Sequence, residues 1–423
     1  MSEVAIKEGY KKTKIGWIPV EWEVVKLEDL VSKVGSGSTP RGGEKVYIKS
    51  GIPFIRSQNV NKNKLLLSNI KYISTDVHNK MKGTVVKAND VLLNITGASI
   101  GRSCVVPNQF IEGNVNQHVC IIRVDNNLIS FFLHSYLASF LGQKVISRNQ
   151  VGGNREGLTK ANVLDLKIPL PPLPEQKKIA QILTTWDTAI EKTEHLLQQL
   201  QLRKKGLMQQ LLSGKKRLKG FKGEWEEVRL GDLGDFKNGI NKSKKDFGIG
   251  NPFVNLMDIF GKPVTRMQKF GLVKVSEDEI ENFNLIKGDI LFVRSSVKPE
   301  GVGLTTLIEE DLPKTVYSGF IIRFREFENV LSHEFKKHCF YNPDFRKSLI
   351  IRSSVSANAN INQDNLKKLK IKLPNIKEQK VLADILNQAD LEIQKTKNYL
   401  TQLQEQKQGL MQQLLTGQKR VKV

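Results

Sequence analysis

The sequence predicts an α+β protein with two homologous α/β domains separated by two long helices, which form an antiparallel coiled coil with a pseudo-twofold internal repeat. Two observations lead to this fold class. Several segments occur twice at one fixed offset, and two long stretches carry apolar residues at heptad spacing. Hydrophobic residues make up 39% of the 423 residues and charged residues 26%, a composition typical of a globular protein.

The duplication is clearest at two helix ends. GLMQQLLSGKKR at residues 206–217 is nearly identical to GLMQQLLTGQKR at residues 409–420. At the same offset, EWEVVKLEDL at residues 21–30 aligns with EWEEVRLGDL at residues 224–233. Two matched anchors at one offset indicate that the chain is a tandem pair of related halves.

Between these anchors the two halves are less alike. IPFIRSQNV at residues 52–60 resembles NPFVNLMDI at residues 251–259, and NDVLLNITG at residues 89–97 resembles GDILFVRSS at residues 288–296. A retained framework around a divergent body predicts two related domains with different surfaces. The predicted domains are residues 1–170 and 217–373, and the predicted helical spacers are residues 171–216 and 374–423.

Each spacer is predicted to be one helix of about 38 residues, or about 57 Å at 1.5 Å per residue. The prolines at 171–174 suit a helix entry, and Gly214 and Gly417 suit C-terminal caps. A single apolar stripe on so long a helix requires a partner, and the other copy is the natural one. Pairing with helices of another protein stays open as an alternative. The residues predicted to pair the helices are Leu183, Ile190, Leu197, Leu200, Leu207, Leu211, Leu386, Ile393, Leu400, Leu403, Leu410 and Leu414.

Short β-branched segments in each half predict strands. Examples are GTVVKANDVLLNITG at residues 83–97 and KTVYSGFIIRFRE at residues 314–326, both bounded by turn-forming residues. One helix is predicted over residues 126–142, with a counterpart over residues 332–341. Asp90 and Asp289 open strands at matched places, and we expect them to hold turns.

The net charge indicates a polyanionic partner. Lysine and arginine exceed aspartate and glutamate by 23, and the sequence pI is about 9.7. The excess is spread along the chain and is smallest in residues 220–368. Nucleic acid is the first candidate for such a partner. No apolar run is long enough to span a bilayer, and no signal peptide is visible, so we expect a cytoplasmic protein.

Motifs for catalysis or metal binding are not found in the sequence. Cys104, Cys120 and Cys339 form no CxxC pair, and neither HExxH nor GxxxxGK[ST] occurs. NPDF at residues 342–345 resembles the [ND]PP[YF] signature of amino-methylating enzymes, but the third residue is Asp and no FxGxxG-type loop precedes it. We therefore interpret NPDF as a turn at a helix end, and the chain as a recognition protein with no metal site and no catalytic residues.

Four segments together resemble the specificity subunits of type I restriction–modification systems. They are KKTKIGWIPVEWEVVKLEDL at residues 11–30, ITGASIGR at residues 95–102, LPPLPEQKKIAQIL at residues 170–183, and the GLMQQLL helix ends. The resemblance covers both halves and both helices.

This resemblance implies a non-catalytic subunit in which two target-recognition domains each read one half of a split, asymmetric site in double-stranded DNA. It implies that the paired helices set the spacer between half-sites and dock two methyltransferase (modification) subunits. Restriction/translocase subunits would complete the complex. It implies no cofactor for this chain, whereas the partner subunits would use S-adenosylmethionine, ATP and Mg²⁺. Two alternatives remain: a self-contained DNA methyltransferase or restriction enzyme, and a coiled-coil scaffold without a DNA role.

Direct readout of bases needs side chains with several donors or acceptors, chiefly Arg, Lys, Asn and Gln. Polar, glycine-containing segments in each domain supply them, although a solvated surface loop is the simpler interpretation of any one residue. The candidate DNA-binding residues are Arg102, Gln117, Arg148, Asn149, Gln150, Asn154, Arg155, Asn241, Lys242, Lys244, Lys245, Arg294, Lys298, Arg352, Asn358 and Asn360.

Overall fold

The computed structural model describes residues 8–150, 157–355 and 358–423. The chain divides into two compact units. The first unit comprises residues 1–194 and 398–423, and the second comprises residues 195–397. Each unit therefore contains one α/β domain together with part of both long helices.

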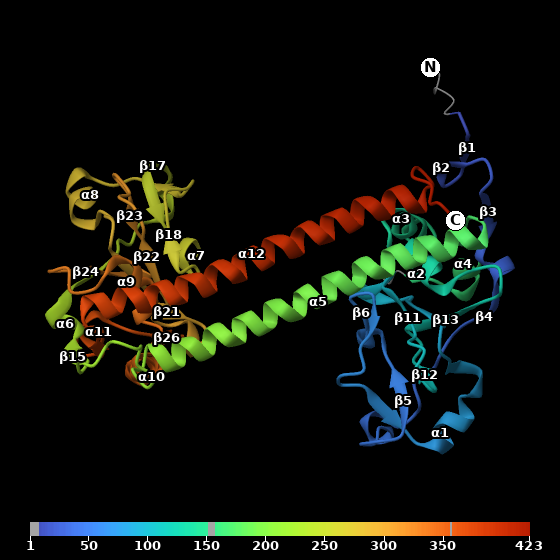
Figure 1. Ribbon diagram of the computed structural model, residues 1–423, viewed down its shortest axis with the longest axis horizontal. Coiled ribbons are helices and arrows are strands. Elements are labelled where there is room, and N and C mark those ends of the chain that lie inside the picture. The colour runs from blue at the N-terminus through green and yellow to red at the C-terminus, as the bar shows by residue number, and fades with distance from the viewer. Residues whose placement is uncertain (1–7, 151–156, 356–357) are drawn as a thin grey trace. The chain divides into compact units, whose positions relative to one another are not determined.

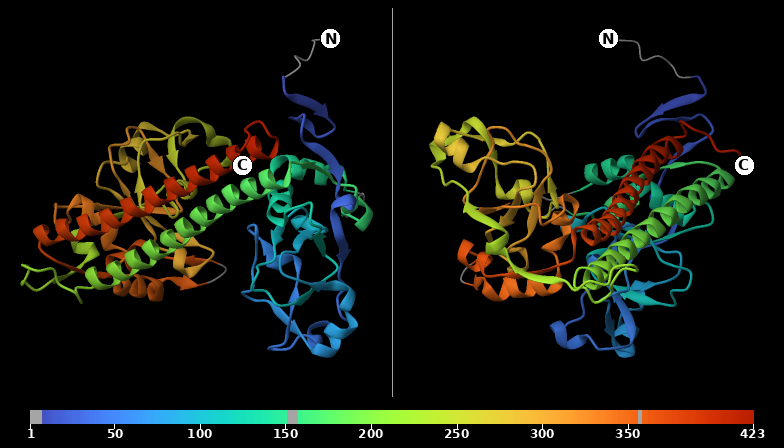
Figure 2. Two further views of the ribbon diagram at one scale, coloured as in Figure 1. Left: turned by 45° about the vertical axis from the view of Figure 1, so that its right-hand side comes forward. Right: turned by 60° about the vertical axis from the view of Figure 1, so that its left-hand side comes forward.

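The two long helices are α5 (Leu173–Leu211) and α12 (Ile376–Leu415). They run antiparallel, side by side, in the views of Figures 1 and 2, which confirms the predicted pairing of the two copies. Gly214 and Gly417 follow the helix ends with φ of +70° and +69°, the left-handed conformation of a C-terminal cap.

The predicted pairing residues of both helices are all buried or half-buried. Two lysines occupy polar positions within this apolar seam, and each meets an aspartate of the other helix. Lys204 Nζ lies 2.5 Å from Asp390 Oδ1 in the second unit, and Lys407 Nζ lies 2.5 Å from Asp187 Oδ1 in the first unit. The same pair of residue types thus recurs at matched positions of the duplicated sequence.

The first unit contains two four-stranded sheets, ordered β11-β10-β13-β4 and β8-β5-β12-β9. In the first of these sheets all neighbouring strands are antiparallel, whereas β5 and β12 in the second are parallel. The strands are β4 (Val31–Ser36), β5 (Ile52–Ile55), β8 (Lys71–Ile73), β9 (Val85–Val86), β10 (Val91–Asn94), β11 (Ser103–Val105), β12 (Gly113–Val115) and β13 (Val119–Val124).

The second unit repeats this arrangement with changes at the edges. Its main sheet has the order β16-β24-β20-β22-β18, and two three-stranded sheets have the orders β19-β17-β23 and β21-β26-β25. The strands are β16 (Gly234–Asn238), β17 (Phe247–Val254), β18 (Val264–Thr265), β19 (Gly271–Val273), β20 (Ile290–Val293), β21 (Ser295–Ser296), β22 (Thr305–Ile308), β23 (Val316–Tyr317), β24 (Ile321–Glu326), β25 (Ser354–Val355) and β26 (Ala359–Asn360).

A short antiparallel pair leads into each long helix. β3 (Glu23–Lys26) pairs with β14 (Lys167–Leu170) in the first unit, and β15 (Glu226–Arg229) pairs with β27 (Lys370–Leu373) in the second. Smaller elements complete the units: β1 (Tyr10–Thr13), β2 (Gly16–Pro19), β6 (Val60–Asn61), β7 (Lys64–Leu65), α1 (Thr75–Lys80), α4 (Lys160–Leu164), α6 (Leu230–Leu233), α7 (Leu256–Ile259), α8 (Glu277–Phe283), α10 (Pro343–Arg352) and α11 (Gln363–Lys367).

The prediction of one helix over residues 126–142 was wrong in its extent. The structure has two helices there, α2 (Ser130–Ala138) and α3 (Phe140–Arg148), with extended backbone at Ser139 between them. The Ser139 hydroxyl accepts a hydrogen bond from the Gly142 amide, so this residue caps the second helix and ends the first. The predicted counterpart is present as the single helix α9 (His333–Cys339).

Each unit has a core closed by the beginning of one long helix and the end of the other. Leu183 of α5 and Leu414 of α12 belong to one buried cluster with Trp22 in the first unit. Leu211 of α5 and Leu386 of α12 belong to a buried cluster with several phenylalanines in the second unit. Burial of these helix ends makes both long helices part of each folding unit. Among the described residues, no helix is both long and apolar enough to cross a membrane.

Candidate nucleic-acid interface

A buried arginine–aspartate pair fixes the same point of the main sheet in both units. Arg123 on β13 donates from Nε and Nη2 to the two carboxylate oxygens of Asp90, at 2.7 and 2.8 Å. Arg325 on β24 makes the same bidentate contact with Asp289, at 2.8 and 2.7 Å. Both carboxylate side chains are 1% exposed. The two pairs therefore give a firm structural alignment of the two domains.

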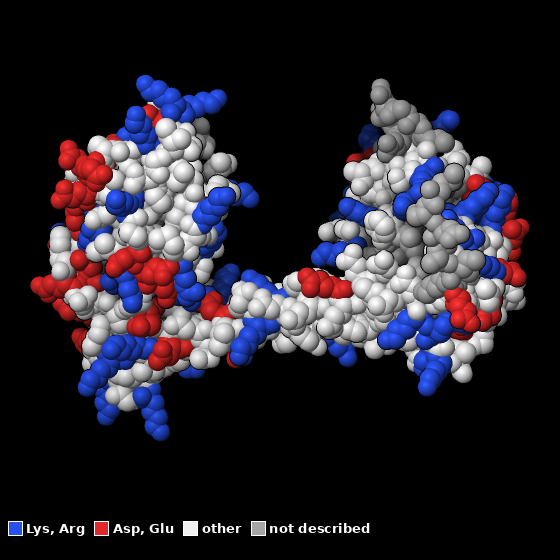
Figure 3. All heavy atoms as spheres, turned by 90° about the horizontal axis from the view of Figure 1, so that it is seen from above, with Lys and Arg blue, Asp and Glu red and all other residues white. Residues whose placement is uncertain are grey.

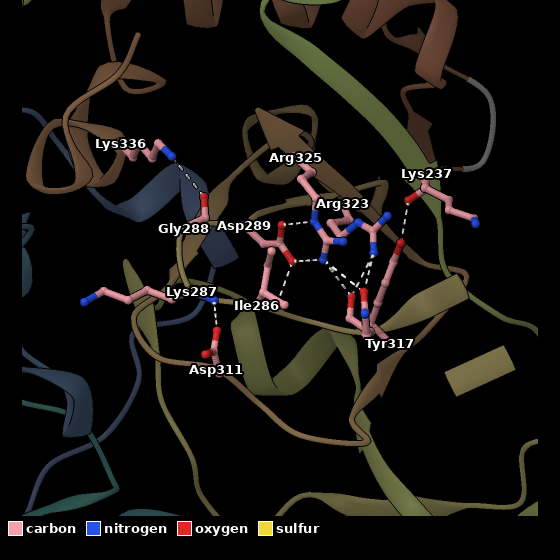
Figure 4. Close-up of polar contacts among 11 residues, drawn as sticks. Lys237, Ile286, Lys287, Gly288, Asp289, Asp311, Tyr317, Arg323, Arg325 and Lys336 are labelled. Carbon is pink, nitrogen blue, oxygen red and sulfur yellow. Dashed lines mark hydrogen bonds and ion pairs between the residues drawn. The ribbon is translucent and has the colours of Figure 1, made fainter. Parts of the chain in front are cut away.

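Figure 4 shows the contacts around Asp289. Asp289 Oδ2 also accepts a hydrogen bond from the Ile286 amide at 2.9 Å. In the first unit, Asp90 Oδ2 accepts one from the Lys87 amide at 2.7 Å. These contacts confirm that the two aspartates hold turns, as the sequence predicts. Their arginine partners were not predicted, because they lie 33 and 36 residues away along the chain. Hydrogen bonding to Asp289 raises the pKa of Arg325, and hydrogen bonding to Asp90 raises the pKa of Arg123.

Strand pairing brings three separate segments together at one end of this sheet in the first unit. Because Asn94 on β10 pairs with Val119 on β13, residues just after β10 meet residues just before β13. Thr96 Oγ1 contacts His118 Nδ1 at 2.5 Å. The backbone of Thr96 also forms a bridge with Gly157.

In the second unit, the corresponding segments meet at the same end of the main sheet. Val293 pairs with Ile321, so residues after β20 meet residues before β24. Ser295 pairs with Asn360, as Thr96 bridges Gly157 in the first unit. We call this place the strand-end surface. It comprises Thr39 with residues 94–102, 116–118 and 157 in the first unit, and Asn241 with residues 293–304, 318–320 and 358–360 in the second.

Five candidate residues of the second unit lie on the strand-end surface. Arg294 donates from Nη1 to the Gly319 carbonyl at 3.0 Å, and Asn241 packs so closely on Gly319 that an added Cβ would lie 2.1 Å from its Oδ1. Asn360 Oδ1 contacts the Ser295 hydroxyl. Lys298 and Asn358 are exposed and line a common pocket there. These five residues come from three segments far apart in the sequence.

The remaining candidates of the second unit lie elsewhere. Lys242 is held in an ion pair with Glu279, with 2.7 Å between Nζ and the carboxylate. Lys244 and Lys245 are exposed on the short 3-10 turn that follows. Arg352 is exposed at the end of α10 and lines a different pocket, of about 900 Å³.

In the first unit, Arg102 and Gln117 lie on the strand-end surface and are exposed. Arg102 Nη1 lies 3.4 Å from Asn61 Oδ1, and Gln117 Oε1 accepts from the Thr39 hydroxyl. Thr39 was not predicted, because its contact with Gln117 joins residues that are 78 positions apart.

Three further first-unit candidates lie at the end of α3. Arg148 is exposed and Gln150 is half-buried. Asn149 donates from its amide to the Val145 carbonyl at 2.9 Å, so it caps the helix in this structure. Asn154 and Arg155, which were also predicted, lie outside the described residues.

Charge is unevenly spread over the surface of the second unit. Acidic side chains form red patches on this unit, at the left of Figure 3, and lysine and arginine side chains gather on other parts of its surface. The first turn of α8 alone carries Glu277, Asp278 and Glu279. Because the acidic and basic side chains lie on different parts of the surface, the basic regions can contact DNA phosphates.

Among the described residues, no three His, Cys, Asp or Glu side chains are grouped as metal ligands. The three cysteines are free and buried, and burial raises the pKa of Cys104 and of Cys120 to about 12. Asn342 caps α10 by accepting from the Asp344 and Phe345 amides, which confirms the turn predicted for NPDF.

Comparison with known proteins gives a consistent family. The family model for the type I restriction modification DNA specificity domain matches residues 19–202 and again residues 222–405. The chain is 27% identical over 447 residues to the putative type I restriction enzyme MjaX specificity subunit of Methanocaldococcus jannaschii, covering 98% of both proteins. It is 22% identical over 380 residues to the EcoKI specificity subunit of Escherichia coli, covering 86% of this chain and 81% of that protein.

Solved structures show the same fold. A chain from a study of assembly and conformational transition in a type I R-M system superposes with a TM-score of 0.63 at 17% identity, covering 95% of this chain and 99% of that one. The type I S subunit from M. genitalium superposes with a TM-score of 0.54 at 14% identity, covering 93% and 96%. With a family model matching both halves, the chain belongs to the family of type I restriction–modification DNA specificity subunits.

Proposed function

We propose that this chain reads a bipartite, asymmetric DNA site, with one target-recognition domain on each half-site and no catalytic step of its own. The observation that carries this proposal is the strand-end surface. Both domains build it from matching segments on a matching sheet, yet its side chains differ between the two. Two copies of one scaffold with different contact residues suit two different DNA sequences.

The paired helices suit a fixed spacer between the half-sites. Each helix is an uninterrupted element of 39 or 40 residues, and each takes part in the buried cores of both units. A change in the distance between half-sites would therefore require a change in the length of both helices, because one altered helix would lose its register with the other.

We also infer the assembly in which such a chain acts. Two methyltransferase subunits would dock on the paired helices, and restriction/translocase subunits would join them. S-adenosylmethionine, ATP and Mg²⁺ would belong to those subunits. The duplicated helices offer two similar docking surfaces, which suits two copies of one partner.

The test is the methylome of a cell that expresses this chain together with its methyltransferase partner. We expect one split motif with adenine methylated on each strand. A continuous motif, or methylation that is unchanged when this chain is omitted, contradicts the proposal. Methyl transfer by the purified chain alone, given DNA and S-adenosylmethionine, would instead support a self-contained enzyme.

A further inference from the structure

An exposed apolar pocket of about 730 Å³ is lined by residues of the strand-end surface of the second unit and by residues 256–260. Three of its residues stand out, because Val297 is 82% exposed, Met257 78% and Phe320 57%. Large apolar side chains exposed together in a concave site commonly mark a binding surface. The apolar lining consists of Leu256, Met257, Phe260, Val297, Leu304 and Phe320.

Strand pairing identifies which residues of the first unit occupy the same positions. Phe320 directly precedes Ile321, which pairs with Val293, and His118 directly precedes Val119, which pairs with Asn94. His118 is therefore the counterpart of Phe320.

Two further pairs follow in the same way. The Val293 amide donates to the Leu304 carbonyl, as the Asn94 amide donates to the Arg102 carbonyl, so Leu304 replaces Arg102. The parallel pairing of β17 with β23 matches that of β5 with β12. Val254 therefore corresponds to Ile55. The residues that follow these two correspond in the same order: Leu256 to Ser57, Met257 to Gln58, and Phe260 to Asn61.

The same surface is therefore polar in the first unit and apolar in the second. A docking site for a subunit that binds both halves alike would keep matching residues in both. The opposite is found here, so the pocket suits a ligand that differs between the two halves, as the two half-sites of an asymmetric DNA do.

We propose that this pocket of the second target-recognition domain receives the 5-methyl group of thymine in the major groove. This proposal rests on the proposed DNA-reading function. Among the base edges in the major groove, that methyl is the one apolar group, whereas the other edges present hydrogen-bond donors and acceptors. A polar edge placed against Met257 and Phe320 would lose its hydrogen bonds to water without replacement, so the pocket disfavours it.

The rim of the pocket can orient such a base. The residues that line it together with the apolar ones are Ser295, Ser296, Lys298, Glu300, Gly301 and Asn358, so one basic and one acidic side chain lie at this rim. Lys298 is exposed and carries the positive charge that a nearby phosphate requires. In the first unit, Arg102, Gln58 and His118 instead offer donors and acceptors, so we expect that half-site to be read by hydrogen bonds.

The experiment uses the complex of this chain with its methyltransferase subunit and a duplex carrying the methylated motif. Thymines of one half-site at a time are replaced by deoxyuridine, which removes only the methyl group. We expect deoxyuridine in the second domain's half-site to weaken binding about fourfold for each methyl that enters the pocket. The same replacement in the first domain's half-site leaves affinity unchanged. A duplex in which a 5-methylcytosine–guanine pair replaces the thymine–adenine pair keeps the methyl group. It should bind less well than the thymine duplex, because cytosine presents an amino donor where thymine presents the O4 acceptor.

Two variants link this effect to the pocket, each taking the residue of the first unit. Phe320→His and Met257→Gln alter exposed side chains, and we expect each to remove the difference between thymine and deoxyuridine. His118→Phe in the first unit is the matched control and leaves that difference intact.

A second half-site without thymine, or equal binding of thymine and deoxyuridine by the unaltered complex, overturns the proposal while DNA reading itself stands. Variants that weaken assembly with the methyltransferase, yet still distinguish thymine from deoxyuridine, overturn it in favour of a protein-docking surface. A complex that binds no specific site contradicts the proposed function instead.

Discussion

The guanidinium of Arg217, which follows α5, donates from Nε and Nη2 to the two carboxylate oxygens of Glu378 in the first turn of α12, at 3.0 and 2.8 Å. In the first unit Arg420, which follows α12, contacts Glu175 in the first turn of α5, with Nε 3.1 Å from Oε2. Each unit is thus closed by an acid from the start of one long helix and an arginine that follows the end of the other.

Replacing Arg217 with alanine should destabilise the second unit by about 2–3 kcal/mol. The Glu378 side chain is 1% exposed and would lose its charged partner, whereas the Arg217 side chain is 29% exposed, which moderates the loss. Urea unfolding followed by Trp225 fluorescence measures the effect, in a chain whose other tryptophans are replaced by phenylalanine. Trp225 reports on this region because the Arg217 guanidinium lies 5.8 Å from the centre of its ring. Arg420→Ala is the matched control, and it should shift the Trp225 transition less than Arg217→Ala does, because Arg420 pairs with Glu175 in the first unit. An unshifted transition in Arg217→Ala would show that the pair contributes nothing.

A buried histidine in each unit predicts acid sensitivity. Burial lowers the pKa of His134 from 6.5 to about 4, and the nearby Asp187 and Lys407 act on it with opposite signs. In the unfolded chain the His134 imidazole binds a proton below about pH 6.5, whereas in the folded chain it stays neutral until the pH nears 4. Stability is therefore fully present above pH 6.5 and is lost as the pH falls towards 4, by about 3 kcal/mol in all.

His134→Asn should flatten the stability of the first unit between pH 6.5 and 4, since asparagine does not titrate and can still bond the Ser103 hydroxyl. Trp22, which is fully buried in the first core, reports the transition in a chain with its other tryptophans replaced. Burial also lowers the pKa of His338 to about 4, so His338→Asn should flatten the profile of the second unit alone. Parallel profiles for His134→Asn and its parent would refute the expectation.

Lengthening both helices by one heptad should widen the spacer of the recognised site. Seven residues inserted after Glu194 in α5 and seven after Lys397 in α12 leave Lys407–Asp187 and Lys204–Asp390 in register. The added length is about 10.5 Å, or about three base pairs. The methylome of the variant should show unchanged half-sites with the longer spacer. An insertion in only one helix is the control, and it should abolish methylation because one of these ion pairs loses its register. An unchanged spacer in the double insertion would contradict a measuring role for the helices.

Exposed lysines of the second unit should contribute salt-dependent affinity without sequence preference. Lys244→Ala combined with Lys245→Ala should reduce the slope of log affinity against log salt by about 1.8 if both meet phosphates. Titration of the complex with its DNA at several salt concentrations measures this slope. Lys242→Ala is the neighbouring control, because its ammonium is already paired with Glu279. A slope unchanged by the double variant would place these lysines away from the DNA.

Much of the architecture follows from the sequence alone. Periodicity locates the long helices, and glycine at 214 and 417 marks their ends, because these are properties of a few neighbouring residues. The duplication predicts that the helices pair with each other and that the two domains share a scaffold. The break between α2 and α3 was missed because apolar residues lie on both sides of Ser139, and only the hydrogen bonds of its hydroxyl end the first helix and cap the second.

The site depends on contacts that no local pattern contains. Of the predicted candidates, Asn241, Arg294 and Asn360 lie on the strand-end surface. Phe320 was not among the predicted residues, because an isolated phenylalanine in a sequence is usually a core residue. The tertiary structure decides otherwise, since pairing of β20 with β24 places Phe320 at the exposed end of the sheet. The sequence by itself thus determined the duplicated scaffold, whose helices and caps depend on neighbouring residues. Only the tertiary structure decided which side chains share a surface, because strand pairing joins segments that are far apart along the chain.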